Sequence, residues 1–320
     1  MNGQLVVLGA SGFLGRHLIE VARKSGNGLR AVTRQPGSLM AIDGVEWVQA
    51  DLADATSLEQ AVRSDDTVLN LAFMPSAGMA GNMAALDNLI SACSKRGVKR
   101  LIHCSTAMVA GATKTHAIDE ATACCPLTSY ERCKLALEQR LLAAARSEME
   151  VVILRPTAII GPGGANLVSL ARSLLSGSPV LSYVRRSLFG NRPMHLVPVS
   201  TVVRAILHVA QLPGQIDGET FYVSADDDPD NRFAVVERIL RSSLGLSSFQ
   251  ARAIPLPAGL LSVALRLRGR SDVDPARIYS WNKLRQTGFL PKETLADAIH
   301  EFGTWFMKSG NRPSQAIRNA

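Results

Sequence analysis

The chain has 320 residues, of which 47% are hydrophobic and 19% are charged, with a formal net charge of +8. This composition excludes a largely disordered protein, and the length suits one domain with an elaborated end or one and a half domains. The positive charge could suggest a nucleic-acid partner, but the sequence has no helix-turn-helix, zinc or aromatic RNA-binding signature. We therefore expect no nucleic-acid partner, and an anionic small substrate suits the charge at least as well.

No segment is apolar for long enough to predict stable membrane insertion. The longest apolar run near the C-terminus, 254–267, is interrupted by Pro255, Pro257 and Arg266. Its basic flank could favour a membrane surface, and a packed helix with a solvated basic end is the simpler interpretation. The first predicted strand starts within four residues of Met1, which leaves no room for a signal peptide. The five cysteines match no metal spacing, so we expect a cytoplasmic protein with reduced thiols and no metal.

The first predicted strand, over residues 5–8, is followed by glycines at positions 9, 12 and 15, and a helical apolar pattern begins within that motif. A strand that runs through glycines into a helix directs free backbone N–H groups and the helix dipole at one point, where a phosphate can bind. Gly9 is expected to make the tight turn, Gly12 to let a pyrophosphate approach the backbone, and Gly15 to let helix and strand pack closely. This stretch predicts a dinucleotide-binding site.

The second predicted strand, over residues 29–34, ends in Thr33 and Arg34 with no acidic residue. An acidic residue at this place accepts hydrogen bonds from the ribose of NAD, whereas a basic residue pairs with the 2′-phosphate of NADP. The sequence therefore predicts NADP as the cofactor, with NAD as the alternative. The plain alternative for Arg34 is a solvated loop residue.

The rest of the chain alternates strands with helices as far as about Ala165. The other strands are predicted over 45–48, 67–72, 99–106, 151–154 and 220–223, and helices over 83–96, from 128 onward, 166–175, 201–210, 233–244 and 294–305. This order predicts an α/β fold with a Rossmann-type, doubly wound parallel sheet. Residues 179–199 are predicted as short extended pieces. Asp51 follows the third strand, where it could meet the adenine amino group or cap the next helix.

The fifth predicted strand ends in the hydroxyl residues Ser105 and Thr106, at the sheet edge where ligands bind. The next helix carries Tyr130 and Lys134, which are four residues apart and therefore share one face. An ammonium near a phenol is expected to lower the phenol pKa, so that the pair can move a proton while a hydride is transferred. A Tyr-x-x-x-Lys pattern is also common on helices with no catalytic role, and its position after this strand favours catalysis.

Motifs that run nearly from end to end carry a resemblance to a known family. They are Gly9-Ala-Ser-Gly-Phe-Leu-Gly15, Asp51-Leu52, Asn70-Leu-Ala72, Asn82, Ser105 to Gly111, Ile118-Asp-Glu120, Tyr130 with Lys134, Arg155-Pro-Thr157, Gly161-Pro162 and Asn282 to Pro291. On these motifs the chain resembles an extended short-chain dehydrogenase/reductase, of the NAD(P)-dependent nucleotide-sugar epimerase/dehydratase type.

The resemblance implies a domain division and roles for single residues. Residues 1–164, with 195–225 returning, would form the nucleotide-binding domain, and 165–194 with 226–320 a smaller, discontinuous substrate-binding region. Tyr130 would be the general acid/base, Lys134 would tune it and hold the nicotinamide ribose, and Thr106 would bond the reacting oxygen. A homodimer is expected from relatives alone.

The predicted ligand contacts fall into two sets. The cofactor set is Gly9, Ser11, Gly12, Phe13, Leu14, Gly15, Arg34, Asp51, Leu52, Leu71, Ala72, Tyr130, Lys134 and Pro156. The substrate set is Ser105, Asn166 and Arg192.

Two departures from the family pattern bear on the reaction. Dehydratases of this type carry Asp-Glu after the catalytic threonine, and this chain has Ala107-Met108, which can supply neither acid nor base. Ala110 replaces the usual tyrosine of the Val-Tyr-Gly motif. The predicted function is therefore an NADP(H)-dependent reductase, first of a nucleotide-activated keto-sugar. The alternatives are a 4-epimerase with bound NAD, a reductase of an apolar flavonol- or sterol-like substrate, and, last, a nucleotide-sensing protein without turnover.

Overall fold

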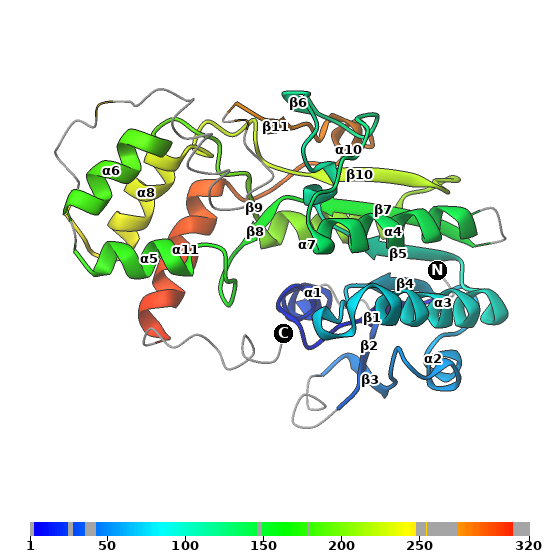
Figure 1. The fold of residues 1–320 in the computed structure, drawn as a ribbon. Coiled ribbons are helices and arrows are strands. Elements are labelled where there is room, and N and C mark those ends of the chain that lie inside the picture. Colours follow the sequence, from blue (N-terminus) through cyan, green and yellow to red (C-terminus); the bar gives the residue numbers. More distant parts are fainter. Residues whose placement is uncertain are drawn as a thin grey trace.

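The structure is a computed structural model that describes residues 3–24, 28–35, 43–145, 149–177, 179–247, 254, 274 and 276–309. Apart from Ile254, the apolar run predicted as a packed helix lies outside the described residues. A sheet flanked by helices forms the larger part, and a group of helices forms a second, smaller lobe beside it (Figure 1).

The strands and helices follow one another as the sequence predicts for most of the chain. The strands are β1 (Leu5–Leu8), β2 (Leu29–Thr33), β3 (Val45–Gln49), β4 (Thr67–Asn70), β5 (Arg100–Cys104), β6 (Ala117–Ile118), β7 (Glu150–Pro156), β8 (Ala158–Ile160), β9 (Leu196–Pro198), β10 (Glu219–Val223) and β11 (Ile278–Tyr279). The helices are α1 (Phe13–Lys24), α2 (Ala55–Ala61), α3 (Gly78–Arg96), α4 (Ser129–Ala144), α5 (Val168–Leu175), α6 (Pro179–Phe189), α7 (Val199–Gln211), α8 (Phe233–Ser243), α10 (Asn282–Gln286) and α11 (Leu295–Lys308), with short 3₁₀ turns η2 (Pro75–Ala77) and η3 (Ala107–Ala110).

Seven strands form the main sheet in the order β10-β7-β5-β4-β1-β2-β3, and every neighbouring pair is parallel. These are the seven strands that the sequence predicts, so the doubly wound sheet is confirmed. The strand order reverses direction between β1 and β4, which is the place where such sheets bind ligands.

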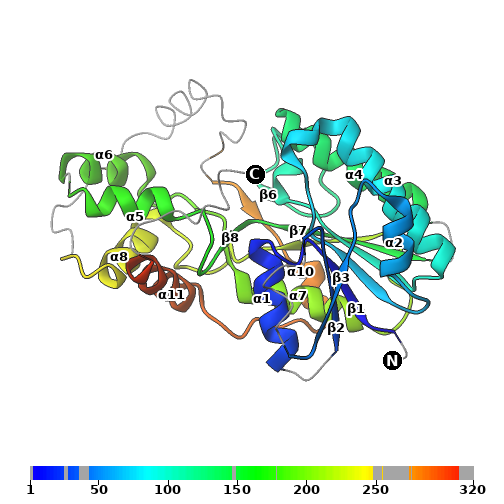
Figure 2. The ribbon, with the colours of Figure 1, turned by 90° about the horizontal axis from the view of Figure 1, so that it is seen from below.

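Helices cover both faces of this sheet (Figure 2). One core packs β-strand side chains such as Val7 against α1 and α7, and the other packs Val6 and Leu101 against α2, α3 and α4. Strands buried on both faces explain why β1 and residues 151–154 of β7 read as continuous apolar runs rather than alternating ones.

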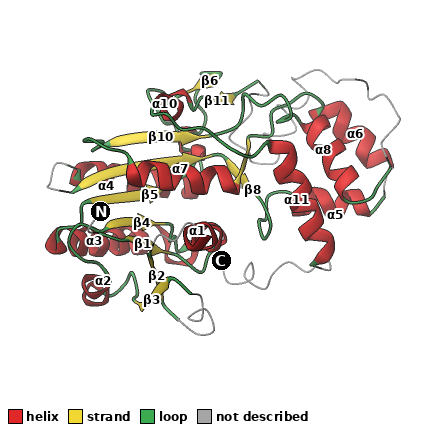
Figure 3. Ribbon diagram, turned by 180° about the vertical axis from the view of Figure 1, so that it is seen from behind, coloured by secondary structure: helices red, strands yellow, loops and turns green. Residues whose placement is uncertain are grey.

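The second lobe consists of α5, α6, α8 and α11, seen together in Figure 3. Its core is a separate apolar cluster that includes Ala171, Val236 and Phe302. The prediction of extended pieces over 179–199 was wrong for its first half, which is helix α6. This helix packs against α8, and a 2.6 Å ion pair joins Arg186 to the buried Glu237. That tertiary partner is far along the chain and leaves no local signal.

The helix predicted over 83–96 begins five residues earlier, at Gly78. Two glycines in the first turn hid this start, because glycine weakens helix propensity. The Asn82 side chain contributes instead, since its amide bonds the backbone oxygens of Met74 and Gly78, each at 2.7 Å.

Residues 276–289, near the C-terminal end of the described chain, pack on the nucleotide-binding part. Trp281, Leu284 and Phe289 lie in the same core as α1 and α7, and β11 pairs with β6. Residues 276–289 thus pack on the first lobe, although they fall within the predicted substrate-binding region.

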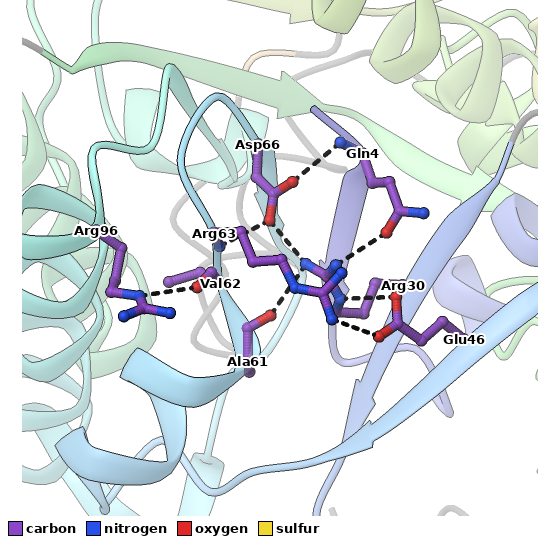
Figure 4. Close-up of polar contacts among 8 residues, drawn as sticks. All are labelled: Gln4, Arg30, Glu46, Ala61, Val62, Arg63, Asp66 and Arg96. Carbon is purple, nitrogen blue, oxygen red and sulfur yellow. Dashed lines mark hydrogen bonds and ion pairs between the residues drawn. The ribbon is translucent and has the colours of Figure 1, made fainter. Parts of the chain in front are cut away.

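The amino ends of four strands are joined by a buried ionic cluster (Figure 4). Arg30 on β2 is 1% exposed and bonds Asp66 at 2.7 Å and Glu46 at 3.1 Å. Asp66, which precedes β4, also accepts the backbone N–H groups of Gln4 and Arg63. The cluster therefore fixes β1, β2, β3 and β4 relative to one another, at the end of the sheet opposite the expected ligand edge.

Among the helices that the structure describes, none combines the length and apolar character needed to cross a bilayer.

Candidate active site

A pocket of about 800 Å³ lies at the carboxyl ends of β1, β2 and β4. Eight of the predicted cofactor contacts line it: Gly9, Ser11, Gly12, Arg34, Asp51, Leu52, Leu71 and Ala72. Its volume falls in the range of small-molecule and cofactor sites. The structure therefore brings together residues from four separate segments, and their contacts with a cofactor stay predictions.

The glycines of the first turn have the geometry that a dinucleotide cradle needs. Gly9 has φ +82°, and a Cβ built there would lie 3.0 Å from the backbone N of Ala72. A Cβ on Gly15 would lie 2.5 Å from the oxygen of Gly9, so only glycine lets α1 approach β1 this closely. A Cβ built on Gly12 would lie 3.2 Å from the Gly9 oxygen, and Gly12 lines the pocket. This cradle fits a pyrophosphate at the N-terminus of α1.

Three predicted cofactor residues of this motif lie differently. Leu14 and Gly15 are buried in the core. Phe13 stacks edge-on against His17, and a Cβ on Gly164 would lie 3.1 Å from its ring. Phe13 therefore packs against the turn that leads to the second lobe, and the described pocket lining includes none of these three residues, so their cofactor contacts stay predictions.

Asp51 and Arg34 occupy two sides of the pocket. The Asp51 carboxylate accepts the N–H of Ala53 at 2.9 Å, while Asp54 caps α2. Arg34 is exposed, follows the end of β2 and lines the pocket. Gln35, Phe73 and Met74 also line the pocket. They were missed because they lie in loops without a motif.

Local capping positions the first turn of α4. Thr128 accepts the N–H of Glu131 at 3.1 Å, and the Glu131 carboxylate accepts the N–H of Thr128 at 3.2 Å, which completes a capping box. Tyr130 therefore lies in a defined first turn, and its ring meets Phe73 edge-on at 5.4 Å.

Thr106, Tyr130 and Lys134 lie near one another at the end of β5, and their catalytic roles stay predictions. Tyr130 lies close enough to Thr106 for the Thr106 side chain to affect its pKa, and the Lys134 ammonium donates to the oxygen of Cys104 at 3.3 Å. The ammonium also lies 4.7 Å from the centre of the Phe73 ring. The phenol, the hydroxyl and the ammonium thus meet at the end of β5, beside the pocket residue Phe73.

The expected lowering of the phenol pKa is not what the structure shows. Burial raises the pKa of Tyr130 above its ordinary value of 10, with a smaller raising effect from Cys104, and the nearby Thr106 side chain opposes this rise. Burial also lowers the pKa of Lys134, and nearby Cys104, Cys133 and Glu138 oppose that shift. The ammonium is directed at the Cys104 carbonyl and the Phe73 ring, so it does not offset the effect of burial on the phenol pKa.

The predicted substrate residues are spread over a wider region. Ser105 is buried at the end of β5, next to Thr106. The Asn166 amide donates to the oxygen of Ile159 in β8, seven residues earlier in the chain. Arg192 follows α6, and its backbone pairs with Phe189 and Phe233. Pro156 ends β7 and is buried. Substrate contact by Ser105, Asn166 and Arg192, like cofactor contact by Pro156, stays a prediction.

A family model described as the NAD dependent epimerase/dehydratase family matches residues 5–224. The chain belongs to this family. The family resemblance drawn from the motifs is thereby confirmed, and the chain is an NAD(P)-dependent enzyme.

Curated proteins whose sequences are similar to this chain have different activities. It is 27% identical to sterol demethylase protein B of Methylococcus capsulatus, over 69% of each chain. It is 32% identical to 2-alkyl-3-oxoalkanoate reductase of Stenotrophomonas maltophilia, over 52% of this chain and 53% of that one. It is 25% identical to UDP-glucose 4-epimerase of Vibrio cholerae, over 98% of both.

Solved structures of the family share the fold. UDP-glucose 4-epimerase of Thermotoga maritima, solved with UDP-glucose, gives a TM-score of 0.69 at 20% identity and covers 96% of this chain and 99% of its own. dTDP-glucose 4,6-dehydratase of Bacillus anthracis, solved with NAD, gives 0.71 at 18% identity and covers 96% of this chain and 97% of its own.

Proposed function

We propose that this family member is an NADP(H)-dependent reductase that converts a ketone to a secondary alcohol, with Tyr130 as the proton donor. The observation that carries the proposal is the placement of Tyr130 in the first turn of α4, with its ring 5.4 Å from that of the pocket residue Phe73, over which the Lys134 ammonium also lies. Burial also raises the pKa of Tyr130. A phenol that keeps its proton at neutral pH is the form of a general acid that a reduction needs.

Each residue of the site has its own role in the proposed reduction. When bound, the reduced cofactor supplies a hydride to the carbonyl carbon. The Tyr130 O–H gives its proton to the carbonyl oxygen, and the Thr106 hydroxyl bonds the same oxygen and holds it in place. The Lys134 ammonium, which donates to the oxygen of Cys104, would hold the nicotinamide ribose. Ala107 and Met108 offer no second acid or base, which argues against elimination of water.

Exposed apolar side chains around Tyr130 favour an apolar substrate. Met108, two residues after Thr106, is 50% exposed, and Leu127, three residues before Tyr130, is 49% exposed. Both are exposed apolar side chains close in sequence to the proposed catalytic residues, and apolar side chains beside a polar site suit an apolar ligand. The matches to a sterol demethylase protein and a 2-alkyl-3-oxoalkanoate reductase support the same substrate class.

A nucleotide-activated keto-sugar, the substrate that the sequence predicts first, is the second candidate. The full-length match to a UDP-glucose 4-epimerase favours it, because that match includes the second lobe. A cytoplasmic homodimer stays part of this proposal.

One panel of substrates separates these candidates. The purified protein with NADPH would be offered a 3-oxosteroid, a 2-alkyl-3-oxo acid and a UDP-4-keto-sugar, and consumption of NADPH would be followed. We expect turnover of an apolar ketone. Turnover of the keto-sugar alone would select the second candidate, and NAD released on denaturation, together with interconversion of UDP-sugars, would indicate an epimerase.

The raised pKa of Tyr130 predicts a pH dependence with opposite signs in the two directions. The phenol is protonated below its folded pKa, which lies above 10. We therefore expect kcat/KM for ketone reduction to be flat from about pH 6 to 9, and kcat/KM for alcohol oxidation to rise with pH over the same range. Initial rates in both directions would check this, and reduction that fell steadily from pH 6 upward would contradict a protonated donor.

Arg34 is predicted to set the preference for NADPH. Arg34→Ala removes a cation from the pocket rim, so the Kd for NADPH should rise roughly tenfold to a hundredfold while the Kd for NADH changes little. Fluorescence titration with both cofactors measures this. Arg23→Ala, at the exposed end of α1, is the matched control and should leave both constants unchanged. Equal weakening of both cofactors would contradict a role at the 2′-phosphate.

A further inference from the structure

His103 is a buried titratable side chain that the proposed reaction does not use. It lies on β5, in the middle of the sheet, and is 1% exposed. Within the described parts of the chain, neither of its ring nitrogens has a hydrogen-bond partner. Burial lowers the pKa of His103 well below its ordinary value, and the positive charge of Lys134 acts in the same direction. The neutral ring then offers one donor and one acceptor.

Ser105, two residues after His103, carries a second buried polar side chain. Its N–H bonds the oxygen of Leu154 at 2.8 Å, so the strand pairing continues past His103, and side chains two residues apart in a strand share a face. The Ser105 hydroxyl is also buried without a hydrogen-bond partner among the described residues.

Lys134 lies over the same face. Its ammonium donates to the oxygen of Cys104, the residue between His103 and Ser105. Helix α4 covers this face of the sheet, where Leu101 and Leu137 belong to one core cluster. An ammonium has three N–H donors, so Lys134 can serve an acceptor besides Cys104.

We propose that a buried water molecule binds between the His103 ring, the Ser105 hydroxyl and the Lys134 ammonium, and that His103 positions Lys134 through this water. A water molecule offers two donors and can accept two hydrogen bonds, which is enough to pair all three groups. Buried polar atoms in folded proteins are nearly always paired with protein or with ordered water. His103 is thus a positioning residue, and its effect on turnover rests on the proposed function.

The pKa of Lys134 should depend on whether this water is bound. Cys133 and Glu138 face Lys134 from α4, and His103 and Cys104 face it from β5, while Arg155 of β7 holds Glu138 through a 2.6 Å ion pair. A water that accepts from the ammonium favours its charged form. Loss of the water should therefore lower the pKa of Lys134. The fall of kcat at high pH that follows loss of the Lys134 charge, here called the alkaline limb, should then occur at lower pH.

Two variants and one crystal structure of the full chain test the proposal. The wild-type crystal structure, at a resolution that shows ordered water, should contain a water within hydrogen-bond distance of His103 and of the Lys134 Nζ. His103→Leu should lower kcat roughly tenfold to a hundredfold and move the alkaline limb down, without loss of thermal stability. His103→Gln, which can still hold a water, should recover most of both effects.

Two results would contradict the proposed role of His103. If His103→Leu keeps the wild-type kcat and alkaline limb, or if the wild-type crystal structure shows no water there, His103 has no positioning role. The crystal structure and an NMR titration of the Lys134 side chain decide this even if no ketone is reduced, so failure of the proposed function is recognised separately. If His103→Leu does not fold, Ser105→Ala replaces it and should shift the Lys134 titration in the same direction.

Discussion

Replacement of Tyr130 with phenylalanine is expected to lower kcat for ketone reduction about a thousandfold. The hydroxyl is the proposed proton donor to the carbonyl oxygen, and general acid catalysis contributes roughly a hundredfold to ten-thousandfold. The substitution keeps the ring that meets Phe73 at 5.4 Å and removes only the hydroxyl, which lies near Thr106. Steady-state kinetics with the best ketone of the substrate panel measures the loss.

The same variant should bind NADPH and unfold as the wild type does. Lys134 keeps its bond to Cys104 without the phenol, so the cofactor Kd should stay within about threefold. A companion variant, Thr106→Val, should lose less activity, because it removes an oxygen-positioning bond and leaves the proton donor in place. If Tyr130→Phe kept wild-type kcat, Tyr130 could not be the proton donor.

The second large effect concerns stability. Asp66→Asn should lower the free energy of unfolding by about 3–5 kcal/mol, because it removes the charged partner of Arg30, which is buried in the interior. Asp66 is 2% exposed and accepts from the Arg30 guanidinium and from two backbone N–H groups, so no solvent replaces the lost charge. Urea unfolding followed by circular dichroism measures the difference.

Asp65→Asn is the matched control for this variant. Asp65 is exposed and has φ +63°, a conformation that asparagine also tolerates, so its replacement should change the unfolding free energy by less than about 0.5 kcal/mol. The ionic cluster lies at the amino ends of the strands, so folded Asp66→Asn should keep its kcat. A loss below about 1 kcal/mol would mean that Glu46 alone compensates Arg30.

Much of the fold follows from local sequence signals. All seven strands of the sheet were predicted, and the clearest of them, β1 and β7, are buried strands that read as short apolar runs. The glycine motif predicted both the positive φ of Gly9 and the close approach at Gly15, since each is a backbone requirement that only glycine meets without strain. The capping box at Thr128 likewise defines the start of α4 within four residues of chain.

The sequence could not predict interactions between distant segments. Helix α6 was missed because its partner Glu237 lies 51 residues away, and the return of Trp281 to the first core depends on contacts with strands at the other end of the chain. The direction of the Tyr130 pKa was also mispredicted. Sequence spacing places an ammonium four residues from the phenol, but burial and the direction of the ammonium decide which effect is larger.

The sequence by itself determined the order of the strands along the chain, the glycine cradle and the pairing of Tyr130 with Lys134 on one helix face, because these depend on neighbours within a few residues. Tertiary structure alone decided that Arg34 and Asp51 line one pocket, that Arg30 is enclosed with Asp66, and that the polar side-chain atoms of His103 and Ser105 are buried without a partner among the described residues. Burial and side-chain direction arise only when separate segments pack together, and they set the charge and the chemistry of this site.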